Sequence, residues 1–120
     1  MKFNAIAKFV RVSPYKLRPL VDNIRGKSVK YALGWLAAYG AQKAVPVQKL
    51  IESASANAKH LHDIEKHDLY VCEIKVDQGP TFKYFKPGAM GRSNVYRKRL
   101  SHISVILKNR DEEVDCGTKG

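Results

Sequence analysis

One stretch of the sequence combines cations and aromatic rings without any carboxylate. Residues 78–110 contain eight Lys or Arg and no Asp or Glu. Within this stretch, Phe, Tyr, Lys and Arg lie on both sides of Pro87-Gly88 and Gly91. Ammonium and guanidinium groups neutralise phosphates, and aromatic rings stack on splayed bases. The combination is typical of a surface that binds structured RNA.

The charge distribution adds a second basic segment. The chain of 120 residues has 22 Lys or Arg against 11 Asp or Glu, a formal net charge of +11. Residues 1–51 contribute +9 and residues 78–110 contribute +8, whereas 52–77 and 111–120 contribute −3 each. A surplus of this size favours a polyanionic partner. We expect the fold to bring the two basic segments onto one face.

Candidate groups for catalysis or metal binding are weak. The only ligand-like cluster consists of His60, His62, His67 and Cys72. Its spacing matches no standard zinc motif. Ser101 and His102 are adjacent, so in a strand they point to opposite faces and cannot form a dyad. The sequence therefore predicts no enzyme, no metal site and no cofactor.

The sequence also argues against a membrane protein. Its longest apolar runs span four or five residues, far short of the roughly 20 that cross a bilayer. Residues 1–12 lack the continuous apolar run of a signal peptide. We therefore expect a soluble, cytoplasmic protein.

Three helices are expected to position the basic segments. The first begins at Ser13-Pro14 and ends at Gly26, the second is capped by Ser28 and ends at Gly40, and the third spans about 42–60. Each has an apolar stripe at helical spacing. The stripes are Leu17, Leu20, Val21 and Ile24; Val29, Ala32, Leu33 and Leu36; and Val47, Leu50, Ile51, Ala54 and Ala58.

Three strands complete the expected body, at residues 3–12, 69–77 and 101–107. Alternation predicts that Phe3, Ala5, Ala7 and Phe9 share one side of the first strand, and Tyr70, Cys72, Ile74 and Val76 one face of the second. The predicted fold is α+β: a small three-stranded antiparallel sheet packed on three helices, with a long protruding β-hairpin at about 79–101. Residues 1–110 form one domain, and 111–120 are expected to be a disordered acidic tail.

The predicted hairpin has turn chemistry at Pro87-Gly88 and Gly91. Its arms of about nine residues would reach on the order of 30 Å beyond the sheet. A lone two-stranded ribbon is marginal in water, and the like charges on this one repel, so we expect an anionic partner to stabilise it. Phe82, Tyr84 and Tyr96 can pair across the strands or stack on bases, and both uses remain open.

Five segments, in order and in register, carry a resemblance to a known family. They are 13–18 (SPYKLR) with 22–26 (DNIRG), 49–58 (KLIESASANA), 76–80 (VDQGP), 87–92 (PGAMGR) and 98–103 (KRLSHI). Together they resemble large-subunit ribosomal protein number twenty-two, bacterial type, over about residues 3–108. The chain departs from the family pattern at Gly88, where arginine is frequent, and at Leu100, where threonine is frequent.

The resemblance implies a structural constituent of the large ribosomal subunit that binds 23S-type rRNA and supports subunit assembly in the cytoplasm. Its hairpin would be threaded through rRNA, and the tip, Gly88, Ala89, Met90 and Gly91, would line the polypeptide exit tunnel. The implied partners are large-subunit rRNA, neighbouring large-subunit proteins and the nascent polypeptide. The implied rRNA contacts are Arg11, Lys16, Arg18, Arg25 and Lys27 on the body, and Lys83, Lys86, Arg92, Arg97, Lys98 and Arg99 on the hairpin.

An alternative of another class is a free-standing RNA-binding regulator. Residues 88–91 (GAMG) spell GxxG, the loop with which KH domains clamp nucleic acid. In KH domains this loop joins two helices, whereas here it joins two arms with strand character. The match is therefore weak support for the alternative.

Overall fold

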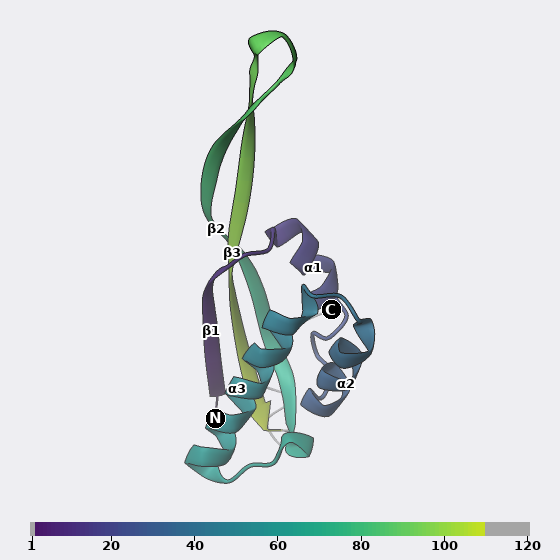
Figure 1. Cartoon of the computed structure of the whole chain (residues 1–120). Coiled ribbons are helices and arrows are strands. Elements are labelled where there is room, and N and C mark those ends of the chain that lie inside the picture. The colour runs from purple at the N-terminus through teal and green to yellow at the C-terminus, as the bar shows by residue number, and fades with distance from the viewer. Residues whose placement is uncertain (1, 110–120) are drawn as a thin grey trace.

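The computed structural model describes residues 2–109, and it confirms the α+β architecture (Figure 1). Strands β1 (Lys2–Val10), β2 (Leu69–Pro87) and β3 (Ser93–Asn109) form an antiparallel sheet in the order β1-β3-β2. The helices are α1 (Pro14–Asp22), α2 (Val29–Tyr39) and α3 (Ala44–His62), and two 3-10 turns are η1 (Lys66–Asp68) and η2 (Ala89–Gly91). The predicted tail at 111–120 lies outside the described residues.

The helix ends follow the predicted caps in part. The Ser28 hydroxyl accepts a hydrogen bond from the Tyr31 backbone N–H at 3.2 Å, and Gly40 ends α2 in the left-handed region. Ser13 instead precedes α1 with extended backbone and makes no side-chain cap bond. Helix α1 also ends at Asp22, earlier than the predicted Gly26, and a turn follows in which the Gly26 N–H bonds to the Val71 carbonyl at 2.9 Å.

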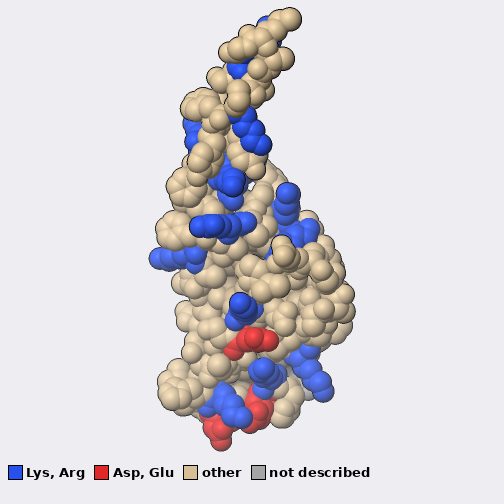
Figure 2. Space-filling view, viewed as in Figure 1, with Lys and Arg blue, Asp and Glu red and all other residues tan. Residues whose placement is uncertain are grey.

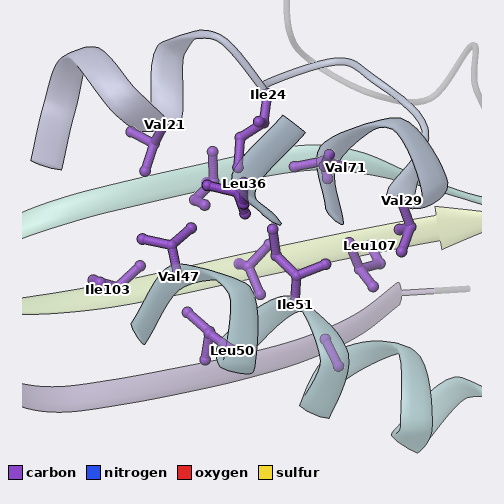
Figure 3. Packing of buried hydrophobic residues seen from close by; sticks show 14 of the residues in the cluster. Val21, Ile24, Val29, Leu36, Val47, Leu50, Ile51, Val71, Ile103 and Leu107 are labelled. Atoms are coloured by element: carbon purple, nitrogen blue, oxygen red, sulfur yellow. The ribbon is translucent and has the colours of Figure 1, made fainter. Parts of the chain in front are cut away.

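The predicted apolar stripes of the helices meet one face of the sheet (Figure 3). Leu17, Ile24 and Ile51 are fully buried, and they pack in one cluster with Ile103 and Leu107 of β3. The helices therefore pack on the sheet because their apolar spacing matches the alternation of the central strand. Trp35 lies at the edge of this core and stacks on Tyr39 with ring centroids 5.1 Å apart.

Two expectations about strand faces are wrong, each because of a β-bulge. The pairing of β2 with β3 shifts between Val71 and Glu73, so Cys72 is an extra residue. Val71 consequently joins Ile74 in the core cluster, together with Leu69 and Val76, whereas the predicted Tyr70 and Cys72 do not. One inserted residue moves every preceding side chain to the other face.

The second bulge lies in β1, between Ala7 and Val10. Phe9 has a positive φ of 59° there and is 59% exposed, instead of sharing the inner side with Phe3. Its backbone N–H donates to Nδ1 of His102 at 3.1 Å, and the two rings meet edge to face at 5.1 Å. Pairing resumes at Val10 with Ser101, where β1 ends.

On the N-terminal side of Ser101, β3 pairs only with β2. The last pair of β1 is Val10 with Ser101, whereas β2 and β3 stay paired up to Pro87 with Ser93. We call residues 79–100 the hairpin. It makes the molecule 63 Å long, with a radius of gyration of 17.2 Å against about 14 Å for a compact chain of this length. The strands of the core sheet thus continue directly into the hairpin and support it (Figure 1).

The hairpin leaves the body at a third irregularity in the sheet. The pairing skips from Gln78 with Ser101 to Thr81 with Arg99, so Gly79 and Pro80 lie opposite the buried Leu100. A Cβ atom on Gly79 would come within 3.0 Å of the Leu100 backbone. Proline cannot donate to a ladder and is tolerated at such a bulge. The Gly-Pro pair therefore suits the close approach of the two strands here.

Candidate nucleic-acid interface

The strand register sorts the hairpin side chains onto two faces. Because successive side chains alternate, one face carries the facing pairs Phe82 with Lys98, Tyr84 with Tyr96 and Lys86 with Asn94. The other carries Thr81 with Arg99, Lys83 with Arg97 and Phe85 with Val95. We name these the aromatic–lysine face and the arginine face. Sequence reasoning found the residues but not this division, which requires the register.

The arginine face holds like charges directly opposite one another. Lys83 and Arg97 are cross-strand partners, an arrangement that destabilises a sheet by itself. The ion pairs recorded among the described residues all lie between Asp22 and Lys75, outside the hairpin. An anion bound between these two cations would relieve their repulsion.

On the aromatic–lysine face, the lysines lie over tyrosine rings. Nζ of Lys86 is 4.2 Å from the ring centroid of Tyr96, and Nζ of Lys98 is 5.9 Å from that of Tyr84. Phe82 and Tyr84 are each 51% exposed. Tyr84 and Tyr96 are thus cross-strand partners, which is one of the two predicted uses of these rings. The exposed ring surface remains accessible for the other use, stacking on bases.

The tip of the hairpin is a tight turn. The Gly88 N–H bonds to the Arg92 carbonyl, the Arg92 N–H bonds to the Ala89 carbonyl at 3.2 Å, and Gly91 has a positive φ of 74°. Met90 also has a positive φ, 56°, and its side chain is 99% exposed. The tip therefore presents Met90 outward from a closed loop.

At the hairpin base, the fold brings together residues from both basic segments. A hollow of about 640 Å³ lies between the β1–α1 connection and the hairpin. Its cations are Arg11, Lys16, Arg97, Lys98 and Arg99, and its aromatic residues are Phe82, Tyr84 and Tyr96. Within the described part of the chain, its lining includes no carboxylate. The expectation that the two segments share one surface is confirmed for these residues.

A buried serine holds the two sides of this hollow together. The Ser101 side chain is fully buried, and its hydroxyl donates to the Val12 carbonyl at 2.7 Å. Val12 directly follows Arg11, so this bond ties the β1–α1 connection to the start of the hairpin. The sequence did not predict this positioning role of Ser101. The only feature that could have indicated it is a polar serine at an inward-facing position of the strand.

The other predicted body cations lie progressively further from the hairpin along β2. Arg18 approaches the Val76 carbonyl at 3.5 Å. Arg25 donates to the Ile74 carbonyl at 2.8 Å and to Asp22 at 2.6 Å. The Lys27 carbonyl accepts from the Val71 N–H. Arg25 thus has a structural role within the body, and the rRNA contacts of these three residues stay predictions.

Several carboxylates gather on the body, away from the hairpin (Figure 2). Glu65 accepts a hydrogen bond from Lys59 at 2.9 Å, which lowers the pKa of Glu65 and raises that of Lys59. The hydrogen bond and charge of Glu73 likewise raise the pKa of Lys75, 3.0 Å away. Phosphates approaching the hairpin therefore meet cations that are not neutralised by these acids.

The described residues contain neither a cluster for a metal ion nor a membrane-spanning helix. Among residues 2–109, no three His, Cys, Asp or Glu side chains are close enough to hold a metal ion. His62 packs on Phe3, with ring centroids 5.4 Å apart. None of the helices within 2–109 is long and apolar enough to span a membrane.

Comparisons with known proteins agree with this geometry. The sequence profile of the family described as "Ribosomal protein L22p/L17e" matches residues 5–108. The chain is 47% identical over 112 residues to "Large ribosomal subunit protein uL22" of Desulforamulus reducens, which covers 93% of this chain and 99% of the relative. It is 49% identical over 108 residues to the protein of the same name from Desulfitobacterium hafniense, with 90% and 95% covered. The chain therefore belongs to the ribosomal protein L22p/L17e family.

Proposed function

We propose that this protein is a structural constituent of the large ribosomal subunit that binds 23S-type rRNA and lines the polypeptide exit tunnel with its hairpin tip. The observation that carries the proposal is the meeting of Arg11 and Lys16 with Arg97, Lys98 and Arg99 at the hairpin base. Relatives that match almost the whole chain bear the name of a large-subunit protein. Membership of the family and the cationic surface at the hairpin base thus both point to large-subunit rRNA as the partner.

The mechanism is electrostatic and geometric. Cations on the hairpin and on the β1–α1 connection neutralise phosphates, releasing counterions from the RNA. The basic surfaces of the body and of the hairpin can in this way hold separate rRNA segments. The body anchors the hairpin at its base. Neighbouring proteins and the nascent chain contact the protein surface that rRNA does not cover. Joining of RNA segments in this way supports subunit assembly.

Sedimentation of a cell lysate at physiological salt tests the proposal. We expect most of the protein to sediment with large ribosomal subunits and to leave them only at high salt, because its contacts are phosphate contacts. The alternative, a free-standing RNA-binding regulator, predicts a protein that remains mostly in the soluble fraction. That result would overturn the proposed function.

The tip is expected to be separable from assembly. Replacing residues 88–91 by Asn-Gly shortens the loop between the paired Pro87 and Ser93 from five residues to three, a length that is also common in β-hairpins, and removes the exposed Met90. Subunit yield should stay near that of the unchanged chain because the cations at the hairpin base remain. The passage of stalling peptides and the binding of tunnel inhibitors should change.

Met90→Ala is the matched control for this shortened hairpin, since it removes the same side chain at full loop length. We expect it to change tunnel-dependent stalling less than the shortening does. A collapse of subunit yield in the shortened variant would show that the tip is required for assembly, contrary to this proposal.

A further inference from the structure

We propose that the hollow at the hairpin base is a pocket for one unpaired ribonucleotide, whose base stacks on Phe82 and Tyr84 while its phosphates contact Arg11 and Lys16. The inference rests on the proposed function, and it deepens it by assigning base recognition to one defined place. The rest of the hairpin needs only phosphate contacts. The pocket would therefore distinguish an unpaired nucleotide from the backbone of a duplex.

The size and lining of the hollow suit such a ligand. Its volume of about 640 Å³ lies within the roughly 300–1,000 Å³ of pockets that enclose small organic ligands. Arg11 and Lys16 contribute cations from the body, and β3 contributes Arg97, Lys98 and Arg99. A phosphate placed here would thus meet positive charge from two directions.

The aromatic residues have the spacing that stacking requires. Phe82 and Tyr84 lie on the same face of β2, two residues apart, so their Cα atoms are separated by about 6.8 Å along the strand. This is twice the roughly 3.4 Å rise between stacked bases, which leaves room for one planar base between the side chains. Phe82 also has no recorded ring or cation contact among the described residues, and half of it is exposed.

Tyr96 has a different part in the same pocket. Lys86 covers one of its faces at 4.2 Å, so Tyr96 is less available for stacking than Phe82. It lies directly across from Tyr84 on the neighbouring strand. The stacking surface of the aromatic–lysine face is therefore assigned to Phe82 and Tyr84 of β2.

Ser13 provides a neutral polar group in the pocket. It precedes α1 in the position where serine ordinarily caps a helix, yet its side chain makes no cap bond. The same residue lines the hollow. Its hydroxyl is therefore available to hydrogen-bond a base edge or a ribose hydroxyl.

The lining favours an unpaired nucleotide over the two nearest alternatives. An A-form duplex presents phosphates and 2′-hydroxyls, but its stacked base faces are inaccessible to side chains, so a duplex would leave the exposed rings unused. An acidic peptide would satisfy the cations but would not require aromatic rings at stacking distance. Only a splayed nucleotide uses both properties of the lining.

The test measures base-dependent affinity in the full-length protein. Fluorescence anisotropy compares a labelled ten-nucleotide oligouridylate with an abasic oligomer that has the same number of phosphates. We expect the unchanged protein to bind the oligouridylate about fivefold or more tightly, because stacking contributes measurably for each base. Equal affinity for the two oligomers would overturn the inference.

A pair of phenylalanine variants locates the effect. Phe82→Ala is expected to abolish the preference for oligouridylate, whereas Phe85→Ala, on the arginine face of the same strand, should retain it. Phe82→Tyr should also retain it, since the ring remains. Equal losses in Phe82→Ala and Phe85→Ala would overturn the inference, because they would indicate non-specific contacts along the hairpin.

The same assay separates this inference from the function on which it rests. Lys16→Gln should weaken binding of both oligomers by the same factor, because phosphates are common to them. Strong binding to large-subunit rRNA without any base preference would overturn the pocket and leave the proposed function standing. Absence of binding to rRNA and to both oligomers would overturn both.

Discussion

Replacing Arg97, Lys98 and Arg99 together with alanine is expected to weaken binding to large-subunit rRNA about a hundredfold at 0.15 M salt. Each phosphate contact releases counterions and contributes about 0.9 to the slope of log K against log salt, so three lost contacts should flatten the slope by about 2 to 3. The three residues line the basic hollow and the recorded ion pairs of the described chain lie elsewhere. Titrations at several salt concentrations measure both quantities.

The matched control removes three positive charges from the body and leaves the hairpin unchanged. Lys30, Lys49 and Lys66 are exposed on the helical side and outside the basic hollow, and their triple replacement by alanine should leave the slope nearly unchanged. Neither triple variant should lower the free energy of unfolding, since removal of Arg97 also relieves its repulsion with Lys83. An unchanged slope in the hairpin variant would contradict the proposed interface.

Leu50→Ala is expected to lower the free energy of unfolding by about 2 to 5 kcal/mol. Leu50 is 6% exposed on α3 and belongs to the core that supports the sheet (Figure 3). Truncation of a buried leucine loses the transfer free energy of its methyl groups and leaves a cavity. Urea denaturation of the isolated protein, followed by circular dichroism, measures the change.

Leu61→Ala on the same helix is the control, because Leu61 is 66% exposed. It should change the free energy of unfolding by no more than about 0.5 kcal/mol. The salt slope of rRNA binding should be that of the unchanged protein in both variants. Saturating rRNA should restore part of the stability lost in Leu50→Ala, because a ligand that binds only the folded state stabilises it. Equal destabilisation by the two variants would contradict the assigned core.

These two predictions separate the functions of the two parts of the molecule. The hairpin variant should lose affinity without losing stability, and the core variant should lose stability without changing the number of phosphate contacts. This separation follows from the structure, in which β2 and β3 belong to the core at one end and carry exposed cations at the other. The same strands therefore transmit the rigidity of the body to the RNA-binding hairpin.

Local sequence patterns predicted the presence of the three helices, the turn and the charge distribution, but not the end of α1 at Asp22. Leu17, Val29 and Ile51 of the predicted stripes are buried, because helical periodicity depends only on residues a few positions apart, whereas Leu33 is only partly buried. Gly40 ends its helix and Gly91 forms part of the tip with positive φ, because glycine pays no steric penalty there. The excess of cations in residues 78–110 likewise needs no tertiary information.

Tertiary structure alone decided which residues meet. Bulges at Cys72 and near Phe9 reverse the predicted strand faces, since a period of two makes each side chain's face depend on pairing with a distant strand. Arg11 lines the same hollow as Arg97, more than eighty residues away, because β1 ends beside Ser101, which bonds to Val12. Arg25, by contrast, is drawn into contacts with β2. Charge content is a property of composition, whereas a binding site depends on register and packing between segments far apart in the chain.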